Sequence, residues 1–283
     1  LGVKWKPTDA GFLAPVIHLE PVVIGGVTIK KAAGKNARWI NNNKIGVGAV
    51  VRLTRAGDVI PDINMDTGVV RQAPEAQMPD RPYKWNKAGV DVLLQDPGAH
   101  KEVGVKRVLK FFTTLKIMGV GERNVEKMIA EGLDSVPMIL RLHQEGKLEE
   151  RLLAVDGFEK KTATKINTGI GTALAKATLP LLMHASRMFS APGDVDEGAR
   201  SALGKKKFAL ILNALPDILV SDRTPAEKTA LVQQVDGMGE RTSAKFVRDI
   251  PAFVEWMKAS GLEARLVPTK VSEKKDTGHP LRQ

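Results

Sequence analysis

The chain has 283 residues, 43% of them hydrophobic and 27% charged, which is enough for about two globular domains with buried cores. Its 43 Lys and Arg residues outnumber its 32 Asp and Glu residues, and the resulting net charge of +11 favours a polyanionic partner such as nucleic acid. The absence of cysteine excludes disulfides, thiol catalysis and Cys-ligated zinc, and because the five histidines are scattered singly we expect no metal site. We find no signal peptide and no long apolar run, so we expect a cytoplasmic protein with no membrane partner.

Residues 1–70 have the pattern of a small β-barrel. Runs of β-branched residues punctuated by Gly, Asp and Pro predict short strands in 21–29, 48–55 and 58–63. A basic, Asn-rich stretch that is either helical or a loop, 35–44, connects the first two runs. This pattern predicts an OB-fold, a five-stranded, partly open barrel that binds nucleic acid, although an SH3-like barrel would have a similar pattern.

The rest of the chain divides into a connector, a helical domain and a tail. Residues 71–100 contain Pro74, Pro79, Pro82 and Pro97 and are expected to be a connector, with a short two-stranded ribbon at 83–86 and 90–94. Residues 101–266 have apolar residues at helical spacing and predict an all-α domain. Its expected helices are 103–115, 122–131, 135–142, 148–154, 160–175, 180–189, 199–212, 225–235, 241–250 and 251–260. The polar residues 267–283 are expected to form a disordered tail or a linker, and the whole chain is a multidomain α+β protein.

Three segments of the helical domain, 117–123, 155–163 and 235–245, share one design. Each has an apolar residue, a glycine turn and then the basic or hydroxylated opening of a helix. Glycine can adopt positive φ, and the start of a helix presents unpaired N–H groups and a positive dipole end, so this combination can bind phosphate. The alternative is three well-capped turns. The design is that of the helix-hairpin-helix motif, which contacts the DNA backbone and carries little sequence information.

Each copy supplies candidate DNA contacts. They are Gly119, Gly121, Arg123 and Asn124 in the first copy, Gly157, Lys160, Lys161 and Thr162 in the second, and Gly237, Gly239, Arg241, Thr242 and Lys245 in the third. The second copy has Glu159 where a second glycine is expected, which should narrow its backbone freedom and make it the weakest of the three. Met118, Phe158 and Met238 are expected to pack inside the hairpins rather than contact DNA.

A fourth, degenerate copy is expected around residues 188–199. Its turn is acidic and broken by proline, so it should repel phosphate and serve in packing. The basic run 204–207 that follows is either a solvated helix face or a phosphate contact, and we do not include it among the candidates.

The runs 18–29 (HLEPVVIGGVTI) and 55–61 (RAGDVIP), at this spacing and followed by hairpin repeats, resemble the C-terminal half of the NAD-dependent DNA ligases. The resemblance covers nearly the whole chain, to about Gly261. It implies that the barrel meets the minor groove at a nick and that the hairpin repeats complete a clamp around duplex DNA. The barrel residues expected to contact phosphate or the minor groove are Lys30, Lys31, Lys35, Arg52 and Arg55.

Three further barrel residues have alternative roles. Arg38 and Trp39 could lie on the binding face, and Trp39 could equally belong to the core. Asp58 follows a glycine and is expected to form a turn rather than to ligate a metal.

The sequence departs from that family at several points. The Pro-rich connector stands where relatives carry a four-cysteine zinc finger, and 32–36 reads AAGKN in place of Ala-Thr-Leu-His-Asn. The adenylation domain with its Lys-x-Asp-Gly motif and a C-terminal BRCT domain are missing. Two similar tetrapeptides have Ala154 and Gln234 in place of the nucleophilic lysine, so neither could form a lysyl adenylate.

We therefore expect the DNA-binding portion or subunit of an NAD-dependent DNA ligase, inactive alone, which clamps nicked duplex DNA while a separate adenylation domain seals the bond. The chain has no expected catalytic residue and binds no cofactor, and NAD and Mg²⁺ are expected at the adenylation partner. Either a split bacteriophage ligase or a truncated chain would explain the missing half, with the cytoplasm of a bacterium or of a phage-infected host as its location. The alternative is a non-catalytic module for DNA junctions or damage in repair or recombination. A repair nuclease is a weaker rival because no tight carboxylate cluster is present to hold magnesium.

Overall fold

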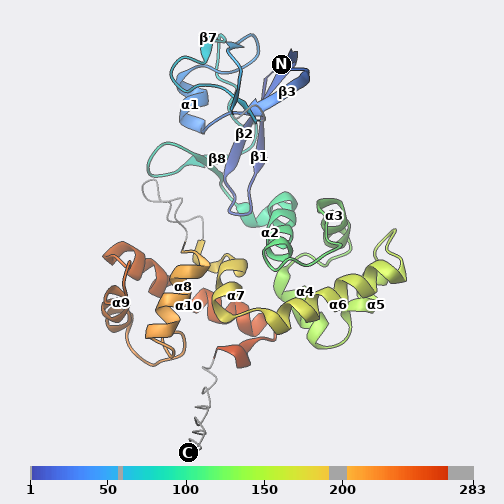
Figure 1. The fold of residues 1–283 in the computed structure, drawn as a ribbon, viewed down its shortest axis with the longest axis vertical. Helices are drawn as coiled ribbons and strands as arrows, with labels where there is room; N and C mark the ends of the chain where they lie inside the picture. The colour runs from blue at the N-terminus through green and yellow to red at the C-terminus, as the bar shows by residue number, and fades with distance from the viewer. Residues whose placement is uncertain (1, 57–59, 191–202, 267–283) are drawn as a thin grey trace, which may run out of the picture.

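The computed structural model describes residues 2–56, 60–190 and 203–266, and it places a β-rich unit at one end of a helical unit (Figure 1). The first three strands, β1 (Gly2–Pro7), β2 (Leu13–Ile24) and β3 (Val27–Ala33), form an antiparallel meander. Gly25 and Gly26 have φ values of 56° and 76° and form the two-residue turn between β2 and β3. The run 21–29 is therefore not one strand, because two successive left-handed residues reverse the chain within it.

The remaining strands of the β-rich unit are short and pair separately. Strand β4 (Val50–Val51) pairs with β7 (Val69–Arg71), and β5 (Thr54–Ala56) pairs with β6 (Ile60–Asp62). Within the described ranges, hydrogen bonds do not join these ladders to the meander, so the strands do not close into one continuous barrel. Pro61 in β6 has no backbone N–H to extend its ladder, and the register of β4 and β7 shifts within two residues.

Helix α1 (Ala37–Asn42) crosses from β3 to β4 and covers the core of the β-rich unit. The Asn36 side chain caps it by accepting from the Trp39 N–H at 2.8 Å. Trp39 and Ile40 are buried in the core together with Val3, Ile17 and Ile63.

The connector is a packed segment. Strands β8 (Tyr83–Trp85) and β9 (Val92–Leu94) form an antiparallel ribbon where a ribbon was predicted, and the turn η1 (Pro97–Ala99) follows it. The Leu94 N–H donates to Gly11 O at 3.0 Å, which joins the ribbon to the turn between β1 and β2. A small core is shared by the β-rich unit, the connector and the first long helix; its residues are Leu13, Ala37, Val92, Leu94 and Val103.

A polar contact also joins the two units. Asp9, in the turn between β1 and β2, has its carboxylate 2.7 Å from the Arg187 Nε, and its backbone carbonyl accepts from the Arg107 Nε at 3.0 Å. Asp9 thus contacts both helix α2, through Arg107, and the residue that follows α7, Arg187.

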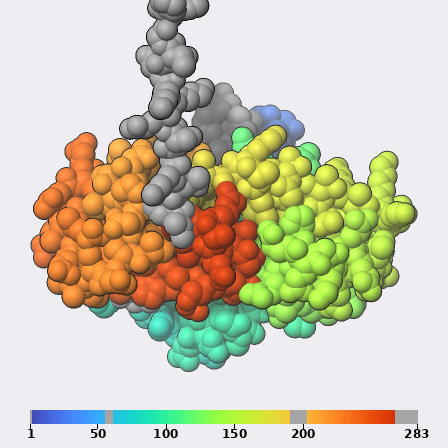
Figure 2. Space-filling model, turned by 90° about the horizontal axis from the view of Figure 1, so that it is seen from below, coloured from blue at the N-terminus to red at the C-terminus, as the bar shows by residue number. Residues whose placement is uncertain are grey.

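The helical unit has one continuous core. Its helices are α2 (Lys101–Thr114), α3 (Glu122–Ala130), α4 (Val136–Gln144), α5 (Leu148–Leu153), α6 (Lys160–Lys176), α7 (Leu179–Ser186), α8 (Lys205–Ala214), α9 (Pro225–Gln233) and α10 (Glu240–Ala259), with short turns η2 (Met188–Ser190) and η4 (Glu263–Arg265). Helices α8 and α9 lie on one side of α10, and α4 to α6 lie on the other (Figure 2). In the ranges that the structure describes, none of the helices has the length and apolar character needed to span a bilayer.

Helix α10 corrects one prediction. The sequence predicts separate helices at 241–250 and 251–260, whereas the structure has one helix that passes through Pro251. A proline inside a helix removes one backbone hydrogen bond and costs about 3 kcal/mol. Phe246, Ile250, Phe253 and Met257 are all buried, and their burial across the proline offsets that cost.

Candidate nucleic-acid interface

Three hairpins join consecutive helices in the same way: hairpin 1 (115–121) joins α2 to α3, hairpin 2 (154–159) joins α5 to α6, and hairpin 3 (234–239) joins α9 to α10. Each contains one glycine with positive φ, and these are Gly119 at 88°, Gly157 at 72° and Gly237 at 72°. Hairpins 2 and 3 close with the same turn, in which the Phe158 N–H donates to Val155 O at 3.0 Å and the Met238 N–H donates to Val235 O at 3.1 Å. The left-handed conformation thus falls on one glycine in each hairpin, and hairpin 1 has a second left-handed residue, Lys116, with a φ of 57°.

The residue that precedes each following helix, here called the cap residue, does not need to be glycine. Gly121, Glu159 and Gly239 have φ values of −84°, −85° and −82°, with ψ between 161° and 167°. A Cβ added to Gly121 or Gly239 would meet no other atom within 4 Å. The expectation that Glu159 narrows the backbone of hairpin 2 is therefore wrong, because the second position has extended backbone that any residue adopts.

Helix α8 begins in the same way as α3, α6 and α10. Its cap residue Gly204 has a φ of −90° and a ψ of 167°, and the residue before it, Leu203, is buried like Phe158 and Met238. The predicted fourth copy at 188–199 falls mostly on 191–202, outside the described residues. The run 204–207, which is not among the predicted contacts, forms the start of α8. Its order of apolar residue, cap residue, variable residue and base matches the other three helix starts and is the sequence signal that could have identified it.

All four helix starts are open and carry an exposed base at the same position. No side chain caps the first turn of α3, α6, α8 or α10, whereas α9 begins with a complete capping box. The second residue of each of the four helices is basic and exposed: Arg123, Lys161, Lys206 and Arg241. An uncapped helix start with a neighbouring cation is suited to bind an anionic oxygen.

Hairpins 1 and 2 lie side by side, and a lysine from the helix that follows each hairpin contacts the other hairpin. The Lys127 Nζ, on α3, donates to the Asp156 carbonyl of hairpin 2 at 2.8 Å and lies 3.5 Å from the Asp156 carboxylate. In return, the Lys165 side chain, on α6, lies against Gly119 of hairpin 1. Both lysines stand six residues after their cap residue, so equivalent positions of the two helices make the reciprocal contacts.

An acidic residue in the first turn of α3 is neutralised locally. The Lys106 Nζ lies 2.5 Å from Glu122 Oε1, and this hydrogen bond lowers the pKa of Glu122 below its usual value. A negative charge beside the open start of α3 would oppose anion binding, and the Lys106 pair offsets it.

Some predicted contacts are engaged inside the protein. Asn124 Nδ2 donates to Gly119 O at 3.0 Å, so this side chain supports hairpin 1. The Lys245 Nζ lies 3.0 Å from the carboxylate of Asp249, which is buried. Lys160 and Lys161 are exposed, and Thr162 and Thr242 are partly exposed in the first turns of α6 and α10. Phe158 and Met238 are buried as expected, but the packing expected for Met118 is wrong because this residue has a relative exposure of 69%.

Comparison with known proteins gives the family of this chain. Residues 2–75 match the sequence model of the NAD-dependent DNA ligase OB-fold domain. The chain is 31% identical over 258 residues to a DNA ligase of Acanthamoeba polyphaga mimivirus, an alignment that covers 90% of this chain and 38% of the ligase. This chain is a relative of the NAD-dependent DNA ligases.

Two further relatives carry similar names. A putative DNA ligase of Invertebrate iridescent virus 3 is 33% identical over 187 residues, covering 66% of this chain and 23% of that protein. A DNA ligase of Nitrosococcus oceani is 30% identical over 201 residues, covering 65% of this chain and 28% of that protein. The chain thus spans about two fifths or less of the length of these ligases.

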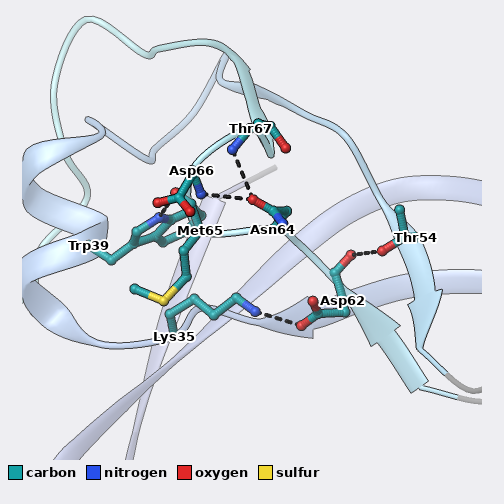
Figure 3. A network of polar contacts seen from close by, with 8 residues as sticks. All are labelled: Lys35, Trp39, Thr54, Asp62, Asn64, Met65, Asp66 and Thr67. Carbon is teal, nitrogen blue, oxygen red and sulfur yellow. Dashed lines mark hydrogen bonds and ion pairs between the residues drawn. The ribbon is translucent and has the colours of Figure 1, made fainter.

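The OB-fold of this ligase relative places its predicted contacts in two groups. Lys30 and Lys31 on β3 and Arg52 after β4 are exposed to solvent. Lys35 instead forms a 2.6 Å ion pair with Asp62 on β6 (Figure 3). Asp58 and the side chain of Arg55 lie outside the described residues.

Arg38 and Trp39 have structural roles. The Trp39 indole is buried and donates to Met65 O at 2.9 Å, so Trp39 belongs to the core and not to the binding face (Figure 3). The Arg38 guanidinium donates to the carbonyls of Gly89, at 2.8 Å, and Ala88, and so ties α1 to the connector. Trp39 is therefore not available as a nucleic-acid contact, whereas Arg38 remains exposed and already binds two carbonyls of the connector.

Proposed function

We propose that this chain is the DNA-binding portion or subunit of an NAD-dependent DNA ligase, which clamps nicked duplex DNA so that a separate adenylation domain can seal the strand. The observation that carries the proposal is the recurrence of one open, basic helix start at α3, α6, α8 and α10. In this proposal the hairpins are helix-hairpin-helix motifs, and the similarity of the chain to DNA ligases supports duplex DNA as their ligand.

Each helix start would bind one phosphate group. The unpaired N–H groups of the first turn would donate to a phosphate oxygen, and Arg123, Lys161, Lys206 or Arg241 would neutralise its charge. These contacts reach only the backbone of the nucleic acid, so affinity should not depend on base sequence. Four phosphate contacts would give a slope of log K against log salt of about −3.6.

The β-rich unit would complete the clamp from the side of the minor groove. Lys30, Lys31 and Arg52 are exposed and could neutralise phosphates there, and Arg55 is proposed on the resemblance alone. Lys35 would have to leave Asp62 before it could contribute, so we assign it a secondary role.

The chemistry of sealing would lie with the partner. Val155-Asp156-Gly157 and Val235-Asp236-Gly237 form hairpin turns, and the positions before them are Ala154 and Gln234, neither of which can carry an adenylate. In this proposal NAD and Mg²⁺ are bound by the adenylation domain, and this chain contributes position, by holding the 3′-hydroxyl and the 5′-phosphate in register.

The test is a mixing experiment. The chain, a separate adenylation domain of an NAD-dependent ligase, and both together are each incubated with a nicked duplex, NAD and Mg²⁺. Sealing that requires the mixture supports the proposal. Nick binding without sealing in the mixture supports instead the non-catalytic junction or damage module, and strand cleavage by the chain with Mg²⁺ alone supports a nuclease.

The helix starts are tested by charge reversal. Lys161→Glu in the first turn of α6 should weaken nicked-duplex binding and reduce the salt slope by about one phosphate. Lys176→Glu is the matched control, because Lys176 is exposed at the other end of the same helix, about 22 Å away. Equal losses in the two variants would show that only net charge matters and that the helix start binds nothing.

A further inference from the structure

We propose that Lys127 and Lys165 are positioning residues that fix the spacing of the phosphate sites at hairpins 1 and 2, without binding phosphate themselves. Each lysine belongs to the helix that follows one hairpin and contacts the turn of the other hairpin, and we call these two contacts the lysine latch. The inference rests on the proposed function and adds to it the residues that hold two of its four helix starts in register.

The first contact of the lysine latch joins α3 to the turn of hairpin 2. The Lys127 Nζ donates to the Asp156 carbonyl at 2.8 Å and lies 3.5 Å from the carboxylate of the same residue. The ammonium group also covers Gly157, because a Cβ added there would lie 2.6 Å from the Nζ. Lys127 thus bonds to the backbone of hairpin 2 beside its left-handed glycine.

The second contact joins α6 to the turn of hairpin 1. A Cβ added to Gly119 would lie 3.5 Å from the Lys165 Cδ, so the aliphatic part of this side chain packs over the glycine. The Gly119 carbonyl accepts from the Asn124 Nδ2 at 3.0 Å. The turn of hairpin 1 is therefore held by the helix that follows it and also by the lysine of α6.

The other two helix starts do not have this arrangement in the residues that the structure describes. Lys245 has the same position in α10, six residues after its cap residue, but its Nζ bonds to Asp249 of the same helix at 3.0 Å. In α8 the corresponding residue is Leu210, which is 47% exposed. The reciprocal contacts therefore belong to the pair of hairpins that lie side by side and are not a general feature of these helices.

The hairpins do not need the lysine latch in order to fold. Both are anchored in the core of the helical unit, hairpin 1 by Ile117 and Val120 and hairpin 2 by Val155 and Phe158. Exposed ion pairs between flexible side chains add little stability. Loss of the latch would therefore leave two folded hairpins whose helix starts move relative to each other, and a duplex would have to order them when it binds.

A distance measurement tests the lysine latch without DNA. Because the chain has no cysteine, Gly121→Cys with Glu159→Cys allows spin labels to be placed on the two cap residues. Both positions are exposed, and a Cβ at Gly121 would meet no atom within 4 Å. EPR should give a narrow distance distribution for the labelled chain, and adding Lys127→Met with Lys165→Met should broaden it. An unchanged distribution overturns the inference.

Two control variants are compared in the same labelled chain. Asp156→Asn removes the carboxylate but keeps the carbonyl to which Lys127 donates at 2.8 Å, so the distribution should stay narrow. Lys176→Met with Lys258→Met removes two exposed charges from the last turns of α6 and α10 and should also leave it narrow. Broadening by either control as large as that of the latch variant overturns the inference.

Salt-dependent binding by the unlabelled chain distinguishes positioning from direct contact. Lys127→Met with Lys165→Met should bind a nicked duplex about 2- to 10-fold more weakly than Lys176→Met with Lys258→Met, because binding must order the two helix starts. The two variants should have the same salt slope, since the bases of the helix starts still reach their phosphates. Equal affinities overturn the inference, and so does a slope lower by about 1.8, which would assign two phosphates to the latch lysines themselves.

The two experiments also separate this inference from the proposed function. Nicked-duplex binding by the parent with no effect of the latch variant on the distance distribution overturns the lysine latch alone. Failure of the parent to bind a nicked duplex overturns the proposed function, and with it the assignment of the spacing to phosphates, even where the latch fixes the distance.

Discussion

The two glycines of hairpin 3 should respond differently to alanine, although the sequence presents them as equivalent. Gly237 has a φ of 72° and Gly239 a φ of −82°, and a Cβ added to either would meet no atom within 4 Å. Packing is therefore not at issue, and the only difference is the backbone conformation. Holding alanine in the left-handed region costs about 1–2 kcal/mol, whereas alanine at position 239 should be neutral or stabilise the protein by about 0.4–1 kcal/mol by restricting the unfolded chain.

The assay is urea and thermal unfolding of Gly237→Ala and Gly239→Ala beside the parent. We expect Gly237→Ala to lower the free energy of unfolding by about 1–2 kcal/mol. For a domain of this size, each kcal/mol lowers Tm by about 2–4 °C. Gly239→Ala should match or exceed the parent. Equal destabilisation by the two changes, or a greater loss for Gly239→Ala, would refute the assignment of one conformational glycine and one free cap residue to each hairpin.

Three further predictions concern single side chains. Pro251→Ala should raise the free energy of unfolding by about 1–3 kcal/mol, measured in urea, because it returns an N–H for the Val247 carbonyl and Pro251 is exposed. Asp9→Asn should lower it by about 1–2 kcal/mol, because the partly buried Arg187 guanidinium loses the carboxylate that lies 2.7 Å away; an unchanged urea midpoint would show that this pair does not hold the two units together. Burial, and then the charge of Arg187, lower the pKa of His184 below 6.5. As the pH falls, the unfolded chain therefore binds a proton at this position before the folded protein does, and the free energy of unfolding should decrease below about pH 6.5. His184→Gln should reduce the loss of Tm between pH 7.5 and 5.5.

Local patterns were sufficient to predict most of the helices but not their continuity. Helix α3 begins at the predicted residue, because its apolar residues Val125, Met128 and Ile129 repeat at helical spacing and the glycine before it ends the turn. Pro251 predicts a helix boundary because proline disfavours helix interiors, and only the packing of residues far apart in the chain shows that the helix continues. Gly25 and Gly26 lie within an otherwise strand-like run, and this pair of glycines is the local signal for the left-handed turn that divides the run into β2 and β3.

The candidate site shows where sequence reasoning reaches its limit. Composition and spacing indicate which residues are basic and which follow a glycine, but they do not show which cations already have an internal partner. Lys35 meets Asp62 across 27 positions, and this contact depends on the fold. Gly204 could have been recognised, since Leu203-Gly204-Lys205-Lys206 follows the order of Met238-Gly239-Glu240-Arg241, but the three successive lysines resembled an ordinary solvated face.

The packed connector bears on how the proposed clamp would work. Two binding surfaces joined by a flexible linker lose conformational freedom when both engage one duplex, and that loss reduces the affinity gained from the second surface. Here the core around Leu13, Val92 and Val103 and the contacts of Asp9 join the β-rich unit to α2 before any ligand is bound. The β-rich unit and hairpin 1 would then meet the duplex as one preorganised surface, and their phosphate contacts would add with little entropic loss. Asp9→Asn should therefore lower the affinity for a nicked duplex, because it weakens this joint. If only net charge mattered, removing the negative charge of Asp9 would instead raise that affinity.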